Sequence, residues 1–177
     1  MSDQAVRQAL PTGTWRVDPI HSTVGFAVPY MAGTFQGSFS DFDARLSDGA
    51  LLGFAGVASV QVKDQALAAH IQSPAFFDAE RFPLLSFEAN AVSRSGDDLT
   101  IAGELRLKGH SEPVEIEGRI SDPAPDPYGG ERLGLQLRAK VDRTKFGLNW
   151  NNPLPSGDPA LANEVTIVAD LQLVKES

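Results

Sequence analysis

The chain contains no cysteine. Disulfide bonds, thiolate metal sites and cysteine nucleophiles are therefore excluded. An excess of positive charge is also missing, since the 177 residues carry a formal net charge of −8. Nucleic acids and anionic membranes are bound through basic surfaces, so this charge argues against both as partners. The negative charge itself favours solubility.

Long hydrophobic runs are absent as well, and none approaches the length of a membrane-spanning helix. Residues 1–10 are polar and contain no apolar segment of the kind found in a secretory signal. We therefore expect a cytoplasmic protein, or a periplasmic one if the chain is a processed form. Glycine-rich phosphate loops and the His-Glu-x-x-His and Gly-x-Ser-x-Gly motifs are missing too, so no familiar motif points to an enzyme.

Apolar alternation is the strongest pattern that the sequence does contain. From Leu99 to Leu107 every second residue is apolar or glycine, and most residues between them are polar. A period of two indicates an extended strand with one dry face. Related stretches lie near residues 15–28, 35–46, 58–62, 85–89, 114–120, 133–141 and 165–173. Together they predict about eight long strands, joined mostly by short antiparallel hairpins.

Such strands form either a sandwich or a closed barrel. Gly37, Gly103 and Gly118 fall on the dry faces. They favour a barrel with a cavity, because inward glycines ease strand coiling or open space, although each alone is equally consistent with a bend point. We expect one barrel domain over residues 14–177, after an N-terminal extension at 1–13.

Two local irregularities are predicted along this barrel. The apolar residues change parity after Phe39, which requires a bulge or a bend. One or two short helices are expected between the third and fourth strands. Residues 63–70 are alanine-rich and suit one or two helical turns. Ser73 and Pro74 have the pattern of an N-cap and a first-turn proline, and Pro83 would stop the helix that they begin.

Polar residues that could carry chemistry are few. Asp18 and His21 lie three residues apart and could share a proton or a metal, but two ligands are too few for a metal site. Fixing a turn is the alternative that we favour for this pair. Arg143 continues the inward face of residues 133–141, so it would point into a barrel mouth and bind an anionic head group there. An ion pair with a nearby carboxylate is the competing interpretation.

Aromatic residues divide into two groups, and core packing is the default for each. The predicted dry faces hold Phe26, Phe35, Phe39 and Phe87. Helix and turn segments hold the second group, which could cover one end of a barrel: Phe76, Phe77, Phe82, Phe146 and Trp150.

Six segments form an ordered set that spans most of the chain. They are residues 15–26, 33–39, 76–87, 103–114, 142–148 and 164–167. In this order they resemble the YceI-like family of polyisoprenoid-binding proteins. The chain departs from that family at Pro29, Tyr30 and Met31, where relatives commonly have a histidine after the strand of Phe26.

The resemblance implies a lipocalin-like, eight-stranded antiparallel β-barrel that holds an isoprenoid lipid, such as a quinone or a prenyl phosphate, in its bore. It implies binding rather than catalysis, no catalytic cofactor, a role in transport and stress response, and a homodimer. We expect ligand contacts from Phe26, Phe35, Phe39, Phe87, Leu105, Leu135, Ile167, Arg143, Phe146 and Trp150. Two other functions stay open. One is an enzyme that acts on a small apolar substrate through Asp18, His21 or Arg143, and the other is a solid-cored dimeric interaction module.

Overall fold

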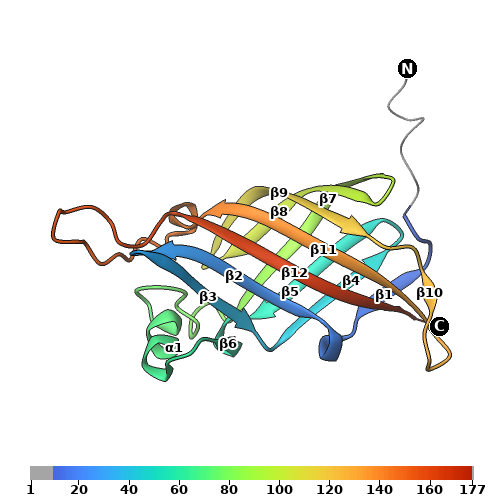
Figure 1. Cartoon of the computed structure of the whole chain (residues 1–177), viewed down its shortest axis with the longest axis horizontal. Coiled ribbons are helices and arrows are strands. Elements are labelled where there is room, and N and C mark those ends of the chain that lie inside the picture. The colour runs from blue at the N-terminus through green and yellow to red at the C-terminus, as the bar shows by residue number, and fades with distance from the viewer. Residues whose placement is uncertain (1–9, 177) are drawn as a thin grey trace, which may run out of the picture.

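A closed barrel of long antiparallel strands forms the body of the protein (Figure 1). The computed structural model describes residues 10–176. Its strands are β1 (Thr14–Val17), β2 (Thr23–Tyr30), β3 (Gly33–Phe39), β4 (Phe42–Ser47), β5 (Ala50–Gly56), β6 (Val60–Gln61), β7 (Leu84–Ser95), β8 (Asp98–Leu107), β9 (His110–Ile120), β10 (Ala124–Pro125), β11 (Glu131–Asp142) and β12 (Glu164–Lys175). The helices are α1 (Gln65–Gln72) and three 3-10 helices, η2 (Pro19–His21), η3 (Val57–Ser59) and η4 (Arg143–Phe146).

Hydrogen-bonded neighbours run round the barrel in the order β11, β9, β8, β7, β5, β4, β1 and β12, and β12 pairs back with β11. One half of β12 pairs with β1 and the other half with β2, so β1 and β2 act as one interrupted strand. In the same way, β3 and β4 follow each other in the chain as a second interrupted strand. β5 pairs with β4, and β6, which follows β5 in the chain, pairs with β3. The predicted eight-stranded antiparallel barrel is therefore confirmed. Most of the extension expected at residues 1–13 lies outside the described residues.

The parity change after Phe39 is confirmed as a break between β3 and β4. Ser40 and Asp41 leave the ladder, and the backbone N–H of Asp41 donates to the Ser59 hydroxyl at 3.0 Å. The Asp41 carbonyl accepts from the N–H of Gly56 at 2.8 Å. The third predicted strand is broken at the same level, because η3 replaces extended chain at Val57–Ser59.

The predicted helix between Ser73 and Pro83 is wrong. Ser73 is instead the C-cap of α1, and its hydroxyl donates to the His70 carbonyl at 2.6 Å. The chain then folds back on the helix end, where the N–H groups of Phe77 and Ala79 each donate at 2.9 Å, to the carbonyls of Ile71 and Gln72 respectively. A left-handed residue, Asp78 with φ of 52°, excludes a continuous helix there. The helical turns expected near residues 63–70 are confirmed as α1.

The space expected at the inward glycines is filled by neighbouring groups. A Cβ at Gly37 would stand 2.5 Å from Cζ of Phe26, and one at Gly103 would stand 2.5 Å from Cζ of Phe87. At Gly118 it would meet the Gln136 carbonyl and the Leu137 side chain. These glycines admit cross-strand side chains and close backbone approach, so the expectation that they leave room for a ligand is wrong.

The barrel has two different ends (Figure 1). The closed end holds β1 and the C-terminus, and a continuous cluster of buried side chains that includes Trp15, Leu133, Leu135 and Leu173 packs it. The mouth end holds α1, η4 and the long segment 147–163. A second cluster there includes Ile71, Phe77, Leu107 and Phe146.

Candidate functional site

Two apolar cavities lie in the bore. The central cavity has a volume of about 130 Å³ and the mouth cavity about 80 Å³. They share five lining residues, which form a waist between them: Val24, Leu85, Leu105, Val141 and Ile167. The bore is therefore not filled by side chains along its whole length, and its two cavities lie in line toward the mouth.

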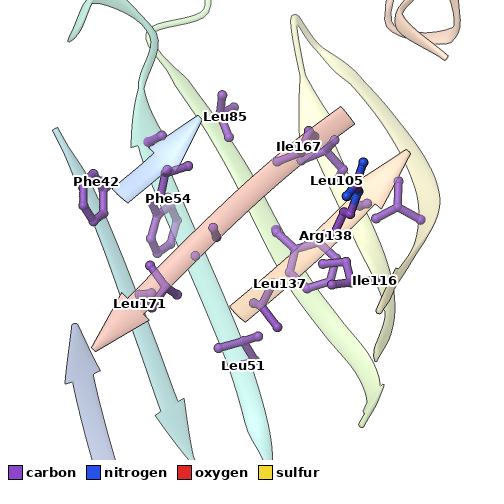
Figure 2. A pocket seen from close by; sticks show the side chains of 18 of the residues that line it. Phe42, Leu51, Phe54, Leu85, Leu105, Ile116, Leu137, Arg138, Ile167 and Leu171 are labelled. Atoms are coloured by element: carbon purple, nitrogen blue, oxygen red, sulfur yellow. The ribbon is translucent and has the colours of Figure 1, made fainter. Parts of the chain in front are cut away.

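Small inward residues create the central cavity. Leu51, Leu137 and Leu171 line it on the side of the closed-end core (Figure 2). Its wall also contains Ala44, Gly53, Ala55, Ala139 and Ala169. A Cβ at Gly53 would meet only the Asp43 carbonyl, 3.9 Å away, so the space in front of this glycine is open. Side-chain volume is missing here, while the strands themselves stay paired.

Aromatic rings dominate the mouth cavity. Phe26 lies 5.9 Å from Phe35 and 5.8 Å from Phe39, measured between ring centroids. Phe77 lies 6.4 Å from Phe26 and continues the row toward Phe76, whose ring is 5.3 Å away. Tilted and edge-on contacts at these distances are favourable, so the rings form one connected path from the bore to the surface of the mouth end.

Eight of the ten predicted contact residues line these cavities. They are Phe26, Phe35, Phe39, Phe87, Leu105, Arg143, Phe146 and Ile167. Leu135 lines neither cavity, because it is buried in the closed-end core. Trp150 also lines neither, since it packs on His70 and Phe76 at the mouth end. Phe82 lies beside Gly109, away from the bore.

Arg143 is 2% exposed and sits in a cage of backbone carbonyls. Its Nε donates to Ala162 at 2.8 Å, and its Nη1 donates to Leu148 at 2.6 Å and Trp150 at 2.8 Å. Nη2 donates to Leu161 at 3.2 Å. Burial lowers the pKa of this guanidinium from its ordinary value. Neither interpretation from the sequence describes these contacts, which tie the segment 148–162 to the barrel.

Comparison with known proteins identifies the fold family. The sequence matches the YceI-like domain over residues 15–173. The chain belongs to the YceI-like family. Protein YceI of Salmonella newport is 26% identical over 136 residues, which cover 72% of this chain and 71% of that protein.

Solved structures agree with this assignment. BcnA of Burkholderia cenocepacia matches with a TM-score of 0.76 at 21% identity, over 88% of this chain and 98% of that chain. A polyisoprenoid binding domain from Saccharophagus degradans matches with a TM-score of 0.70 at 11% identity, over 94% of this chain and 100% of that chain. At such identities the likeness shows the shared fold and nothing finer.

Asp18 and His21 of this YceI-like chain lie at the closed end, in an ion network. The Asp18 carboxylate accepts from His21 Nδ1 at 2.7 Å, from the N–H of Ile20 at 3.0 Å and from Arg132 Nη1 at 2.7 Å. Arg132 also donates through Nε to Asp126 at 2.9 Å. The hydrogen bonds from Arg132 and then His21 hold the pKa of Asp18 well below its usual range. This network fixes the turn, as the favoured alternative predicts.

Acid is expected to weaken the protein partly through Asp18. Because the folded-state pKa is lowered, the carboxylate stabilises the fold above its unfolded pKa of about 3.9, and this contribution is lost as pH falls through the folded value. Asp18→Asn should therefore lose less stability than wild type between about pH 5 and pH 2, measured by urea unfolding. Asp97→Asn, in an exposed pair 3.7 Å from Arg119, is the control. Parallel pH profiles for Asp18→Asn and wild type would contradict this expectation.

Two negative findings apply to residues 10–176. No helix there is long and apolar enough to cross a membrane. No group of three or more His, Asp or Glu side chains in the same part of the chain is placed to hold a metal ion.

Sequence reasoning missed the residues that create the cavities. The waist residues Val24, Leu85 and Val141 read as ordinary strand core. A signal for the central cavity was present, because Ala44, Ala139 and Ala169 stand on inward faces where the neighbouring inward residues are mostly larger. Inward alanines, together with Gly53, mark missing volume in this barrel, whereas Gly37, Gly103 and Gly118 do not.

Proposed function

We propose that the protein binds an isoprenoid lipid, with its apolar tail in the bore, and carries or stores it. The observation that carries the proposal is the pair of apolar cavities joined at the waist. An engineered apolar cavity of about 150 Å³ stays dry and binds benzene, so the central cavity suits about one five-carbon isoprene unit. The printed description of the Saccharophagus neighbour as a polyisoprenoid binding domain supports the same ligand class.

Tail length follows from the two cavities in series. A short tail fills the mouth cavity, and a longer one reaches the central cavity when the waist side chains move apart. Burial of each methylene gains roughly 0.8 kcal/mol relative to water. A bilayer offers the tail the same gain, so exchange with a membrane is nearly balanced and a reversible carrier results.

Binding without catalysis is part of this proposal. Of the three residues that the enzyme alternative would use, Asp18 and His21 line neither cavity. The third, Arg143, lines the mouth cavity, but its Nε, Nη1 and Nη2 all donate to backbone carbonyls. The two cavities alone do not distinguish between the two candidate head groups, a quinone and a prenyl phosphate. A homodimer and the cellular compartment stay predictions from the sequence.

Occupancy of the bore tests the proposal directly. Native mass spectrometry and solvent extraction of the purified protein should show a co-purified lipid, and the emptied protein should take up geranylgeraniol from neutral phosphatidylcholine vesicles. Uptake is expected to leave the folded barrel intact. A protein that carries no lipid and takes none up would overturn the proposal.

A further inference from the structure

One polar atom at the mouth end has no hydrogen-bond partner. It is Nε2 of His70, in the last turn of α1, and it is the single such buried side-chain atom among residues 10–176. Buried polar groups are nearly always satisfied, and one without a partner lowers stability. A binding site explains such an atom, because a ligand can provide the bond that the empty protein lacks.

Aromatic rings surround this imidazole. The centroid of the Trp150 ring lies 4.7 Å from that of His70, with an interplanar angle of 67°. The Phe76 ring lies 6.2 Å away on the helix side, and it is 6.4 Å from Trp150. Because Phe76 also lines the mouth cavity, His70 stands at the outer end of the aromatic path that leads out of the bore.

Two cations hold the backbone of this site and are already bound to carbonyls. Lys108 Nζ donates to Pro74 at 3.0 Å and to Gly147 at 3.4 Å, so it joins the two segments that carry Phe76 and Trp150. Arg143 Nη1 donates to the Trp150 carbonyl at 2.8 Å. These contacts position the rings and leave only the unpartnered Nε2 of His70 and flat apolar faces for a ligand. Such a lining suits an uncharged planar group better than a phosphate.

We propose that His70, Phe76 and Trp150 bind the head group of the lipid, and that this head is an uncharged ring with carbonyl or hydroxyl oxygens, a quinone or a phenol. The tail enters through the mouth cavity and extends toward the central cavity, and the ring packs against Phe76 and shifts Trp150. Nε2 then donates to a carbonyl or accepts from a hydroxyl, according to the imidazole tautomer. This inference rests on the proposed function and selects one of its two head groups.

Three probes with the same tail test the head-group site: a ubiquinone with two isoprene units, geraniol and geranyl phosphate. Their affinities are measured by calorimetry with wild type and His70→Phe. The substitution is expected to lower the affinity for the quinone about tenfold, the size of one hydrogen bond lost in a buried site. Geraniol should bind both proteins alike, and geranyl phosphate should bind wild type more weakly than the quinone.

Stability provides the second readout. Phenylalanine removes the unsatisfied nitrogen and keeps the ring contacts, so His70→Phe should melt at or above the wild-type temperature. If histidine at position 70 gives a higher quinone affinity but a lower stability than phenylalanine, its role is in binding rather than in folding. His70→Gln keeps a polar end and should retain most of the quinone affinity. His21→Phe, at the closed end, is the matched control and should bind all three probes as wild type does.

Each contrary result has a distinct meaning. Equal quinone affinity in wild type and His70→Phe overturns the head-group site, while the proposed function stands if the quinone and geraniol both bind to wild type. An equal loss for quinone and geraniol overturns it too, because it indicates a general change in the mouth. Tighter binding of geranyl phosphate than of the quinone overturns the uncharged head. No binding of any probe to wild type means that the proposed function itself fails.

Discussion

Replacing Gly53 with leucine is expected to exclude a lipid tail from the central cavity. The space in front of Gly53 is open, with only the Asp43 carbonyl within 4 Å of a Cβ, so a leucine side chain fills the cavity with little clash. A tail that reaches this cavity loses the burial of about one isoprene unit, five carbons at roughly 0.8 kcal/mol each. The affinity for geranylgeraniol should therefore fall by about a thousandfold, corresponding to ~4 kcal/mol.

The protein itself should gain stability from this substitution, by about 0.5–2 kcal/mol, because filling an apolar cavity is favourable. Calorimetric binding and urea unfolding measure the two effects on the same sample. Ala102→Leu adds a leucine on the outward, exposed face of β8 and should leave binding unchanged. Unchanged affinity of Gly53→Leu for geranylgeraniol would place the tail elsewhere.

Arg143→Met is expected to lower the free energy of unfolding by about 3–5 kcal/mol, because each buried carbonyl left without a donor costs about 1–3 kcal/mol. The four carbonyls of Leu148, Trp150, Leu161 and Ala162 lose their donor, and at least some of them become buried without a partner. Urea unfolding measures the loss. Arg143→Lys keeps the charge but not the planar fork of donors, so it should recover only part of the stability.

The same variants separate a structural role of Arg143 from the head-group role expected from the sequence. If the guanidinium only holds the segment 148–162, the ratio of the affinities for geranyl phosphate and geraniol should be the same in Arg143→Lys as in wild type. A selective loss of geranyl phosphate, with the stability of both variants unchanged, would restore Arg143 as the anion contact.

Strand positions were the part of this fold open to sequence reasoning. The alternation of Leu99 to Leu107 depends only on which face of a strand is dry, and β8 shows it with every second residue buried. The segment 73–83 could not be read in this way. Its path depends on bonds from Phe77 and Ala79 back to the end of α1 and on the left-handed Asp78, and neither has a periodic signature.

The candidate site was predictable to the same depth. The alternation of each strand predicts which of its phenylalanines face the bore. Arg143 continues the inward face of its strand, so its position at the mouth was predictable in the same way. Its partners were not, because they belong to an irregular loop whose carbonyls carry no sequence pattern. His70 escaped notice since a histidine in the last turn of a short helix looks like a surface residue until Trp150, eighty positions away in the chain, is packed against it.

The closed-end core has a consequence for how such a protein would work between rounds of loading. Trp15, Leu133, Leu135 and Leu173 line neither cavity, so much of the packing at this end lies away from the space that a ligand would fill. We expect the closed end to keep its shape whether the bore is occupied or vacant. Under the proposed function, we therefore expect release of a lipid to require no refolding of the closed end.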